Sequence, residues 1–313
     1  MAKILFVGAR SFSGYWFVKE LVANGHDVTL CLRGSTLDSL EDQDFFIQLH
    51  ELTNSCETVY NAEIGSSTFI QAIEEGHFDI LCIHAAFSTN YRSLEFDFID
   101  ALKNNTSGIS LFIESFKNKG GTGVVLTNSY FQPSESSATA HPAVYPYGLS
   151  KELTFQTYKY YTQLHDLSFG AYYLANPFGI YETRGISKYL LNQWFTNSPA
   201  KINFPNIVRD NIPVTFAARE YHKLVQSVFY CSHICGIISK PSFYAESLNE
   251  FAKRLKQEVQ RRISLECELD IPLNHPAIQE PLILQNDEDV KTEYVNDVDS
   301  FWEDYIGTYS QER

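Results

Sequence analysis

The sequence predicts an α/β protein: a Rossmann-type, doubly wound parallel sheet with a smaller, mixed C-terminal part. Three observations support this prediction. Short apolar runs alternate with segments of helical spacing in the first half of the chain, a loop containing two glycines follows the first run, and prolines become frequent after residue 176. Strands that alternate with helices form parallel sheets covered on both faces, because each right-handed crossover places a helix against the sheet.

The elements follow one another in a regular order. Apolar runs typical of buried strands occupy 3–7, 27–32, 59–64, 79–84, 124–127 and 167–174. Helical spacing is found at 14–24, 67–75, 94–119 and 151–164, and the acidic tail 287–313 is expected to form a closing helix. Gly25 and Gly120 follow two of these helices, and glycine is the usual residue just beyond a helix C-terminus.

Composition and charge exclude several classes of partner. The chain has 313 residues, 44% of them hydrophobic, and 24 Lys and Arg against 38 Asp and Glu give a net charge of −14. Such a charge repels the phosphates of nucleic acids, so we expect no nucleic-acid partner. No apolar run reaches the roughly 20 residues of a membrane span, so we expect no membrane partner.

The cysteines and the N-terminus favour a cytoplasmic protein. The six cysteines are scattered through a long chain, whereas disulfide frameworks belong to short secreted proteins, so we expect reduced thiols. The first apolar run is too short for a signal peptide. Cys231 and Cys235 flank His233 without a second pair of ligands, so we expect no metal site.

The first predicted strand leads directly into the loop 8–14, Gly-Ala-Arg-Ser-Phe-Ser-Gly, and a helix follows. Gly8 permits a tight turn and Gly14 permits close packing of helix on strand, while Ser11 replaces the middle glycine of the common pattern. Backbone N–H groups at the start of a helix can hold a pyrophosphate. An ordinary strand-to-helix turn is the alternative. The dinucleotide contacts expected here come from Gly8, Arg10, Ser11, Phe12 and Gly14.

The second predicted strand ends at Arg33, where NAD-binding proteins usually carry an acidic residue for the ribose 2′-OH. An arginine suits the 2′-phosphate of NADP instead. Arg10 in the preceding loop could reach the same phosphate. We therefore expect NADP (NADPH) as the cofactor, with NAD less favoured; the alternative is that both arginines are solvated surface charges.

Tyr147 and Lys151 are four residues apart and so share one face of a helix. A nearby ammonium stabilises a phenolate and lowers the pKa of the tyrosine, which can then act as a general acid or base at a carbinol or carbonyl. Ser129, at the end of the fifth predicted strand, can hydrogen-bond the same oxygen. We expect Ser129, Tyr147 and Lys151 to be the catalytic residues, although a chance Tyr-x-x-x-Lys spacing is possible among 19 tyrosines.

These features resemble the extended short-chain dehydrogenase/reductase family, which contains nucleotide-sugar epimerases, dehydratases and 4-ketoreductases. Further stretches match it in order at 62–64, 83–86, 105–108, 176–181 and 208–214. The resemblance implies that cofactor contacts also come from Glu63, Ile64, Ala85, Ala86, Asn105 and Lys151. It implies substrate-nucleotide contacts from Asn176 and Arg209, and a homodimer.

The resemblance also implies a division of the chain. An NADP-binding domain would occupy 1–175, with 208–232 returning to it, and a substrate-binding part would occupy 176–207 and 233–313. Two departures from the family pattern are informative. Tyr173 stands where an arginine often precedes the Asn176 motif, and Ser129 is followed by Tyr130 and Phe131 where the dehydratases carry an acidic pair. No carboxylic acid is placed there to expel water, which argues against a dehydratase.

The expected function is therefore NADPH-dependent reduction of the 4-keto group of a nucleotide-activated deoxysugar. A 4-epimerase that retains NAD, a reductase of another carbonyl, and a non-catalytic NADP-binding sensor remain alternatives, because a fold does not decide function. Two histidines are also of interest: we expect His84 to be a packed core imidazole, and His141 could face the substrate.

Overall fold

The computed structural model describes residues 1–35, 46–135, 140–272 and 280–311. The chain divides into two compact units. The first comprises Met1–Ser134, Ala140–Leu174 and Ala217–Lys240, and is here called the cofactor unit because it contains the loop expected to hold a dinucleotide. The second, here called the C-terminal unit, comprises Ala175–Phe216 and Pro241–Arg313 with the short segment Glu135–Thr139.

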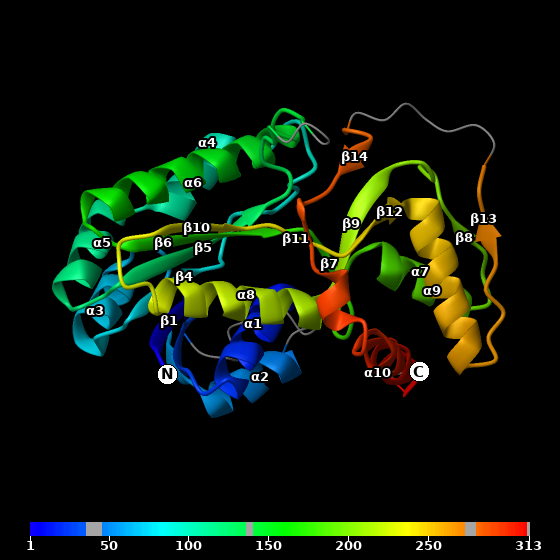
Figure 1. Cartoon of the computed structure of the whole chain (residues 1–313), viewed down its shortest axis with the longest axis horizontal. Helices are drawn as coiled ribbons and strands as arrows, with labels where there is room; N and C mark the ends of the chain where they lie inside the picture. The colour runs from blue at the N-terminus through cyan, green and yellow to red at the C-terminus, as the bar shows by residue number, and fades with distance from the viewer. Residues whose placement is uncertain (36–45, 136–139, 273–279, 312–313) are drawn as a thin grey trace. The chain divides into compact units, whose positions relative to one another are not determined.

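The cofactor unit is built on one parallel sheet of seven strands in the order β10-β6-β5-β4-β1-β2-β3 (Figure 1). The strands are β1 (Lys3–Val7), β2 (Asp27–Cys31), β3 (Glu57–Val59), β4 (Ile80–Ile83), β5 (Gly123–Ser129), β6 (Ser168–Leu174) and β10 (Gly236–Ser239). The strand order reverses between β1 and β4, which is the switch point where such sheets bind dinucleotides. The Rossmann-type fold class is confirmed.

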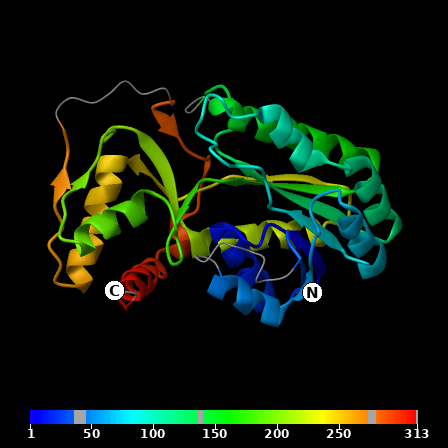
Figure 2. The same ribbon diagram turned by 180° about the vertical axis from the view of Figure 1, so that it is seen from behind.

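Helices cover both faces of this sheet (Figures 1 and 2). One face carries α3 (Ser67–Gly76), α4 (Phe98–Thr106), α5 (Ile109–Asn118) and α6 (Tyr145–Leu164). The other carries α1 (Phe12–Ala23), α2 (Phe46–Ser55) and α8 (Val214–Phe229). Burial on both faces explains the continuous apolar strands, in which β4 and β5 expose no residue.

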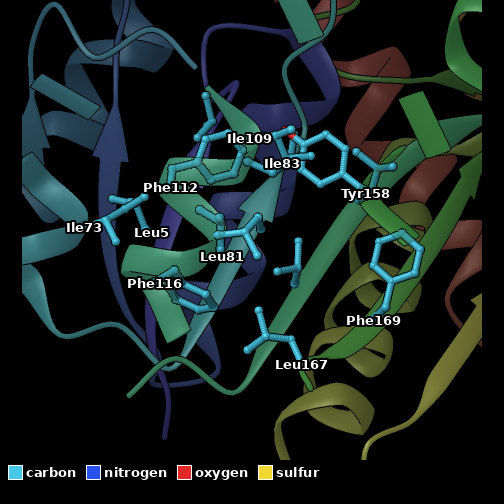
Figure 3. Close-up of a cluster of buried hydrophobic side chains, with 14 of the residues drawn as sticks. Leu5, Ile73, Leu81, Ile83, Ile109, Phe112, Phe116, Tyr158, Leu167 and Phe169 are labelled. Atoms are coloured by element: carbon cyan, nitrogen blue, oxygen red, sulfur yellow. The ribbon is translucent and has the colours of Figure 1, made fainter. Parts of the chain in front are cut away.

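Apolar side chains from the sheet and from α3, α5 and α6 form the core of the first face (Figure 3). Leu81 and Leu126 of neighbouring strands meet Phe112 of α5 and Tyr158 of α6 in this cluster. On the opposite face Phe17 stacks on Tyr221 at 4.3 Å. The thiols of Cys31 in β2 and Cys82 in β4 are buried within the sheet, and burial raises the pKa of each to about 12.

Three elements differ from the sequence-based prediction. The helix predicted at 94–119 is two helices, because Gly108 between α4 and α5 has φ +65° and interrupts the helical backbone. The third strand is Glu57–Val59, not 59–64, and residues 62–64 continue as a loop. The helix that carries Tyr147 begins at Tyr145, six residues before the predicted start at Lys151.

The C-terminal unit contains a mixed sheet of four strands: β7 (Asn176–Phe178), β9 (Val208–Pro213), β12 (Tyr244–Ser247) and β14 (Ile283–Leu284). Helices α7 (Ile186–Phe195), α9 (Leu248–Arg262) and α10 (Val298–Gln311) belong to the same unit, and short pairs join β8 (Ala200–Lys201) to β13 (Leu269–Asp270) and β11 (Pro241–Ser242) to β15 (Glu288–Asp289). Phe178 lies at its centre, within 5.2 to 5.4 Å of the rings of Phe251, Phe301 and Trp302. The helix predicted in the acidic tail is α10, and a short 3-10 helix (Lys291–Tyr294) precedes it.

Two buried histidines, His26 and His222, face each other at 5.3 Å in the cofactor unit. His26 Nδ1 accepts a hydrogen bond from the backbone N–H of Ala2 at 3.2 Å, and neither Nε2 atom has a hydrogen-bond partner in the described part of the chain. Burial lowers the pKa of both imidazoles from 6.5, and the neighbouring His222 lowers that of His26 further.

Replacing His26 and His222 by asparagine is expected to reduce the loss of stability on acidification. The unfolded chain binds protons near pH 6.5, whereas the folded chain does not, so the contribution of these imidazoles is complete above pH 6.5 and is lost as the pH falls. Each group contributes up to about 1.4 kcal/mol per pH unit. Urea unfolding at pH 7.5 and 5.5 measures the effect, with the exposed His50→Asn as control. Equal pH dependence in the double variant and the wild type would contradict the prediction.

Candidate active site

The hydroxyl-bearing residues Ser129 and Tyr147 meet at the carboxyl end of β5. Tyr147 lies in the first turn of α6, and the close approach of this turn to the segment after β5 depends on Gly148, where a Cβ would lie 2.2 Å from the carbonyl oxygen of Phe131. Ser129 is held by a turn closed at Gln132: the Ser129 N–H donates to Gln132 Oε1 at 2.9 Å, and the Gln132 N–H donates to the Ser129 carbonyl at 3.0 Å. The predicted catalytic serine and tyrosine are therefore brought together.

Aromatic rings surround the Tyr147 phenol. The rings of Tyr91, Phe96 and Phe131 have their centres 5.3, 5.7 and 6.2 Å from that of Tyr147. Burial, and to a smaller extent the neighbouring Tyr91, raises the pKa of Tyr147 well above 10.0, and a hydrogen bond with Ser129 only partly opposes this. The lowered pKa expected from the Tyr-x-x-x-Lys spacing is not found, because the apolar surroundings disfavour the phenolate.

Lys151 is buried one turn further along α6. Its ammonium donates to the backbone carbonyl of Thr127 at 2.5 Å, and burial lowers its pKa to about 8. The Thr127 hydroxyl in turn lies 3.0 Å from Nδ1 of His84. His84 is therefore buried, as expected for a core imidazole, but it belongs to a polar chain that sequence reasoning missed.

The loop between β1 and α1 fits the phosphates of a dinucleotide. Gly8 has φ +115°, and a Cβ there would lie 2.4 Å from the backbone nitrogen of Ala85, so only glycine fits. Ser11 caps α1 and accepts a hydrogen bond from the Gly14 N–H at 3.0 Å. Within the described residues the N–H groups of Phe12 and Ser13 have no acceptor, and the first turn of α1 contains no acidic side chain that would repel a phosphate.

Arg33 lies at the end of β2, and its Nε is 3.3 Å from Glu63 Oε1. Both side chains are more than half exposed. The two segments are joined by the backbone, since the Ala62 N–H donates to the Leu32 carbonyl at 3.0 Å. Two residues predicted to contact the cofactor independently thus form one ion pair, in which the carboxylate competes with a 2′-phosphate for the guanidinium. Arg10 is half-buried in the neighbouring loop.

The remaining predicted cofactor residues lie in the loops after β3 and β4 and in α4. Ile64 and Ala85 pack at the edge of the core. The buried Asn105 of α4 accepts a hydrogen bond from the Phe87 N–H at 2.9 Å and so holds the segment that follows Ala86. Its amide is engaged within the protein, which makes it a support for this segment and leaves a direct cofactor contact as a prediction.

The two predicted substrate residues lie in the C-terminal unit. Asn176 Nδ2 donates to Asn211 Oδ1 at 2.7 Å. The Arg209 side chain is 4% exposed and its Nη2 donates to Glu280 Oε2 at 2.5 Å. Nη1 donates to the carbonyls of Val208, Pro281 and Leu282 at 2.7, 3.2 and 3.4 Å. The guanidinium expected to hold a diphosphate is therefore neutralised and secures β9 to β14.

Three residues that shape the site had no signal in the sequence. Gln132 fixes the Ser129 turn and donates to Glu152 Oε2 at 3.0 Å, Tyr91 packs on the Tyr147 phenol, and Glu280 neutralises Arg209. Each acts through contacts with residues distant in sequence or through a turn that no motif marks. His141, considered as a residue facing the substrate, is buried, and its Nδ1 lies 2.8 Å from the carbonyl of Pro142.

A known family model covers the part of the chain that carries these residues. The model of the NAD dependent epimerase/dehydratase family matches residues 4–201, which include the glycine loop, Ser129, Tyr147 and Lys151. The chain belongs to this family. No curated protein is a significant match. In the described residues no group of three or more His, Cys, Asp or Glu side chains could hold a metal ion, and no helix there is long and apolar enough to cross a membrane.

Many solved structures share the fold. UDP-glucose 4-epimerase from Brucella ovis, in complex with NAD, is 16% identical with a TM-score of 0.73, over 99% of this chain and 98% of its own. UDP-glucose-4-epimerase from Stenotrophomonas maltophila, with bound NAD and formylated UDP-arabinopyranose, is 15% identical with a TM-score of 0.75 over the whole of both chains. UDP-N-acetylglucosamine 4-epimerase from Methanobrevibacter ruminantium is 12% identical with a TM-score of 0.72, over 100% of this chain and 99% of its own. At these identities the likeness establishes the fold.

Removing the partner of Arg209 is expected to destabilise the protein. In Glu280→Gln the guanidinium keeps its buried position without a counter-charge, which costs about 3–5 kcal/mol of the free energy of unfolding. The control is Asp289→Asn, whose partner Lys291 is 3.7 Å away and exposed, and which costs less than about 1 kcal/mol. Urea unfolding of the three proteins measures the difference, and a Glu280→Gln variant as stable as wild type would show that the pair does not secure the fold.

Proposed function

We propose that this chain reduces the 4-keto group of a nucleotide-activated deoxysugar with NADPH. The observation that carries the proposal is the aromatic surround of Tyr147, which keeps the phenol protonated at neutral pH. A reductase needs an acid that gives a proton to the nascent alkoxide, whereas oxidation of a carbinol needs a base first. The raised pKa disfavours the phenolate base that oxidation requires, and so it favours the reductive direction.

Different residues of the cofactor unit would bind the cofactor and donate the proton. The N–H groups at the start of α1 would hold the pyrophosphate, and Arg33 and Arg10 would hold the 2′-phosphate. Bound there, NADPH would supply the hydride. Tyr147 would donate its proton to the substrate oxygen, and Ser129 would donate a second hydrogen bond to it. Lys151, fixed by the Thr127 carbonyl at 2.5 Å, would supply a positive charge to the bound cofactor.

The turn after Ser129 supports a reductase over a dehydratase. Gln132 closes this turn, and the two residues inside it are Tyr130 and Phe131, whose rings lie 5.0 Å apart and are both buried. Elimination of water needs a carboxylic acid beside the leaving hydroxyl, and these positions hold a tyrosine and a phenylalanine instead.

A 4-epimerase that retains NAD is the second candidate. Glu63 favours it, because a carboxylate at the end of β3 beside Arg33 could accept the ribose 2′-OH of NAD. The structural neighbours are 4-epimerases with NAD, which supports this candidate at the level of the family. Asn176 is our candidate for the contact with the substrate nucleotide, and Arg209 would hold a diphosphate only after leaving Glu280.

We also propose a homodimer through the helices of the first face. Large apolar side chains are exposed on three of the helices there: Ile99 of α4, Leu111 of α5, and Tyr160 and Leu164 of α6 are 58% to 62% exposed. A second copy would cover these side chains, which a monomer leaves in water.

Removing the Tyr147 hydroxyl is expected to abolish turnover and leave cofactor binding intact. With 4-keto nucleotide deoxysugars as substrates, Tyr147→Phe should lower the rate of NADPH oxidation by about 10²- to 10⁴-fold, because the proton donor is lost. Tyr160→Phe, an exposed tyrosine on the same helix, is the control and should match wild type. Epimerisation of a UDP-hexose with no consumption of NADPH would overturn the reductase and establish the second candidate.

The cofactor preference is expected to depend on Arg33. Quenching of intrinsic fluorescence should give a lower Kd for NADPH than for NADH, and Arg33→Gln should remove most of that difference, since one charge-assisted contact to the 2′-phosphate is worth about 1.5–3 kcal/mol. The denatured protein should release no nucleotide. Tightly retained NAD in the supernatant would contradict this prediction and favour the epimerase.

A further inference from the structure

The His84 ring lies between the phosphate loop and the end of β5. Its Nε2 is 3.0 Å from Ser11 Oγ and 3.1 Å from Ser13 Oγ, and its Nδ1 is 3.0 Å from Thr127 Oγ1. The ring is buried and packs edge-on against Phe17 at 4.9 Å. One imidazole thus joins the loop that would hold the cofactor phosphates to a strand two positions away in the sheet.

The hydrogen bonds assign the tautomer of this ring. Ser11 Oγ accepts from the Gly14 N–H at 3.0 Å and lies 3.1 Å from the Gly8 carbonyl, which can only accept, so the Ser11 proton is used there. The contact with His84 is then a donation from Nε2–H to the second lone pair of Ser11. Burial and the Lys151 charge lower the pKa of His84 to about 3, so the ring carries one proton and Nδ1 accepts from the Thr127 hydroxyl.

The far end of this series of hydrogen bonds reaches Lys151. Thr127 binds the ring through its hydroxyl, while its backbone carbonyl accepts the hydrogen bond of the Lys151 ammonium. At the near end, Ser11 occupies the position of the middle glycine in the common loop, and glycine has no hydroxyl for the imidazole to hold. The link from loop to lysine is therefore a property of this chain's two serines.

We propose that His84, as the Nε2–H tautomer, is a positioning residue that holds the phosphate loop through Ser11 and Ser13 in the conformation that binds the cofactor. This proposal rests on the proposed function only in that the loop binds a dinucleotide. It does not depend on which carbonyl is reduced. His84 reaches the cofactor through the serines and touches no reacting atom.

The test compares two polar replacements of different length. His84→Gln can place an amide N–H near the position of Nε2, whereas the shorter His84→Asn cannot reach the serines. We expect the Kd for NADPH, from fluorescence titration, to stay within about threefold of wild type in His84→Gln and to rise at least tenfold in His84→Asn. The control is His26→Gln, which replaces a buried imidazole of the same unit that bonds the Ala2 N–H.

In a loop that lacks the Ser11 and Ser13 hydroxyls, the two replacements of His84 should no longer differ in their Kd for NADPH. In the Ser11→Gly, Ser13→Ala background, His84→Asn and His84→Gln should bind NADPH with Kd values within about twofold of each other. Equal Kd values for the two variants in the wild-type loop, with thermal midpoints showing both folded, would overturn the proposal. So would an undiminished difference in the background that lacks the serines.

The ring itself provides a readout independent of turnover. In protein labelled with ¹⁵N-histidine, Nε2 of His84 should show the chemical shift of a protonated nitrogen and Nδ1 that of an unprotonated one from pH 5 to 8. The reverse pattern would overturn the assignment. Failure of the wild type to bind either NADPH or NADH would overturn the proposed function and the cofactor role of His84, whereas a wild type that binds NADPH but reduces no keto sugar leaves His84 to be judged by the Kd values alone.

Discussion

The buried ammonium of Lys151 is the constraint on which the end of the central sheet depends. The residue is 3% exposed, and within the described part of the chain the acceptor of its hydrogen bond is a backbone carbonyl, not a carboxylate. A charge taken out of water destabilises the folded state unless polar groups are fixed around it. The apolar run of β5 accordingly ends in the polar residues Thr127, Asn128 and Ser129, and the carbonyl of Thr127 accepts the hydrogen bond of the ammonium.

The same constraint explains the rigidity of the surrounding turns. Gly148 allows the helix that carries Lys151 to touch the Ser129 turn, and Gln132 closes that turn with hydrogen bonds in both directions. Side chains on rigid elements keep catalytic groups within the small tolerance that proton transfer allows. The aromatic rings around Tyr147 bury its hydroxyl and raise its pKa, so they disfavour the phenolate.

Features that depend on residues close together in the sequence could be predicted. The glycine loop is contiguous, Tyr147 and Lys151 are one helical turn apart, and alternating strands and helices determine the parallel sheet. Contacts between residues distant in the sequence could not be predicted. His84 lies 73 residues from Ser11, and Glu280 lies 71 residues from Arg209. The prediction of a single helix at 94–119 was wrong. Its apolar pattern continues across Gly108, but the left-handed backbone of that glycine separates α4 from α5. The prediction of a lowered pKa for Tyr147 was wrong, because rings from two other segments, those of Tyr91 and Phe96 and that of Phe131, surround the phenol.

The cysteines buried in the central strands have a practical consequence. Cys82 in β4 has no exposed surface, and its thiol, with a pKa of about 12, is protonated at neutral pH. Only a thiolate attacks an alkylating reagent, so Cys82 reacts when the sheet opens and water reaches the strand. Its labelling rate in native conditions therefore reports the free energy of opening β4 from its neighbours, and a dinucleotide bound at the adjoining switch point would slow that labelling in proportion to its affinity.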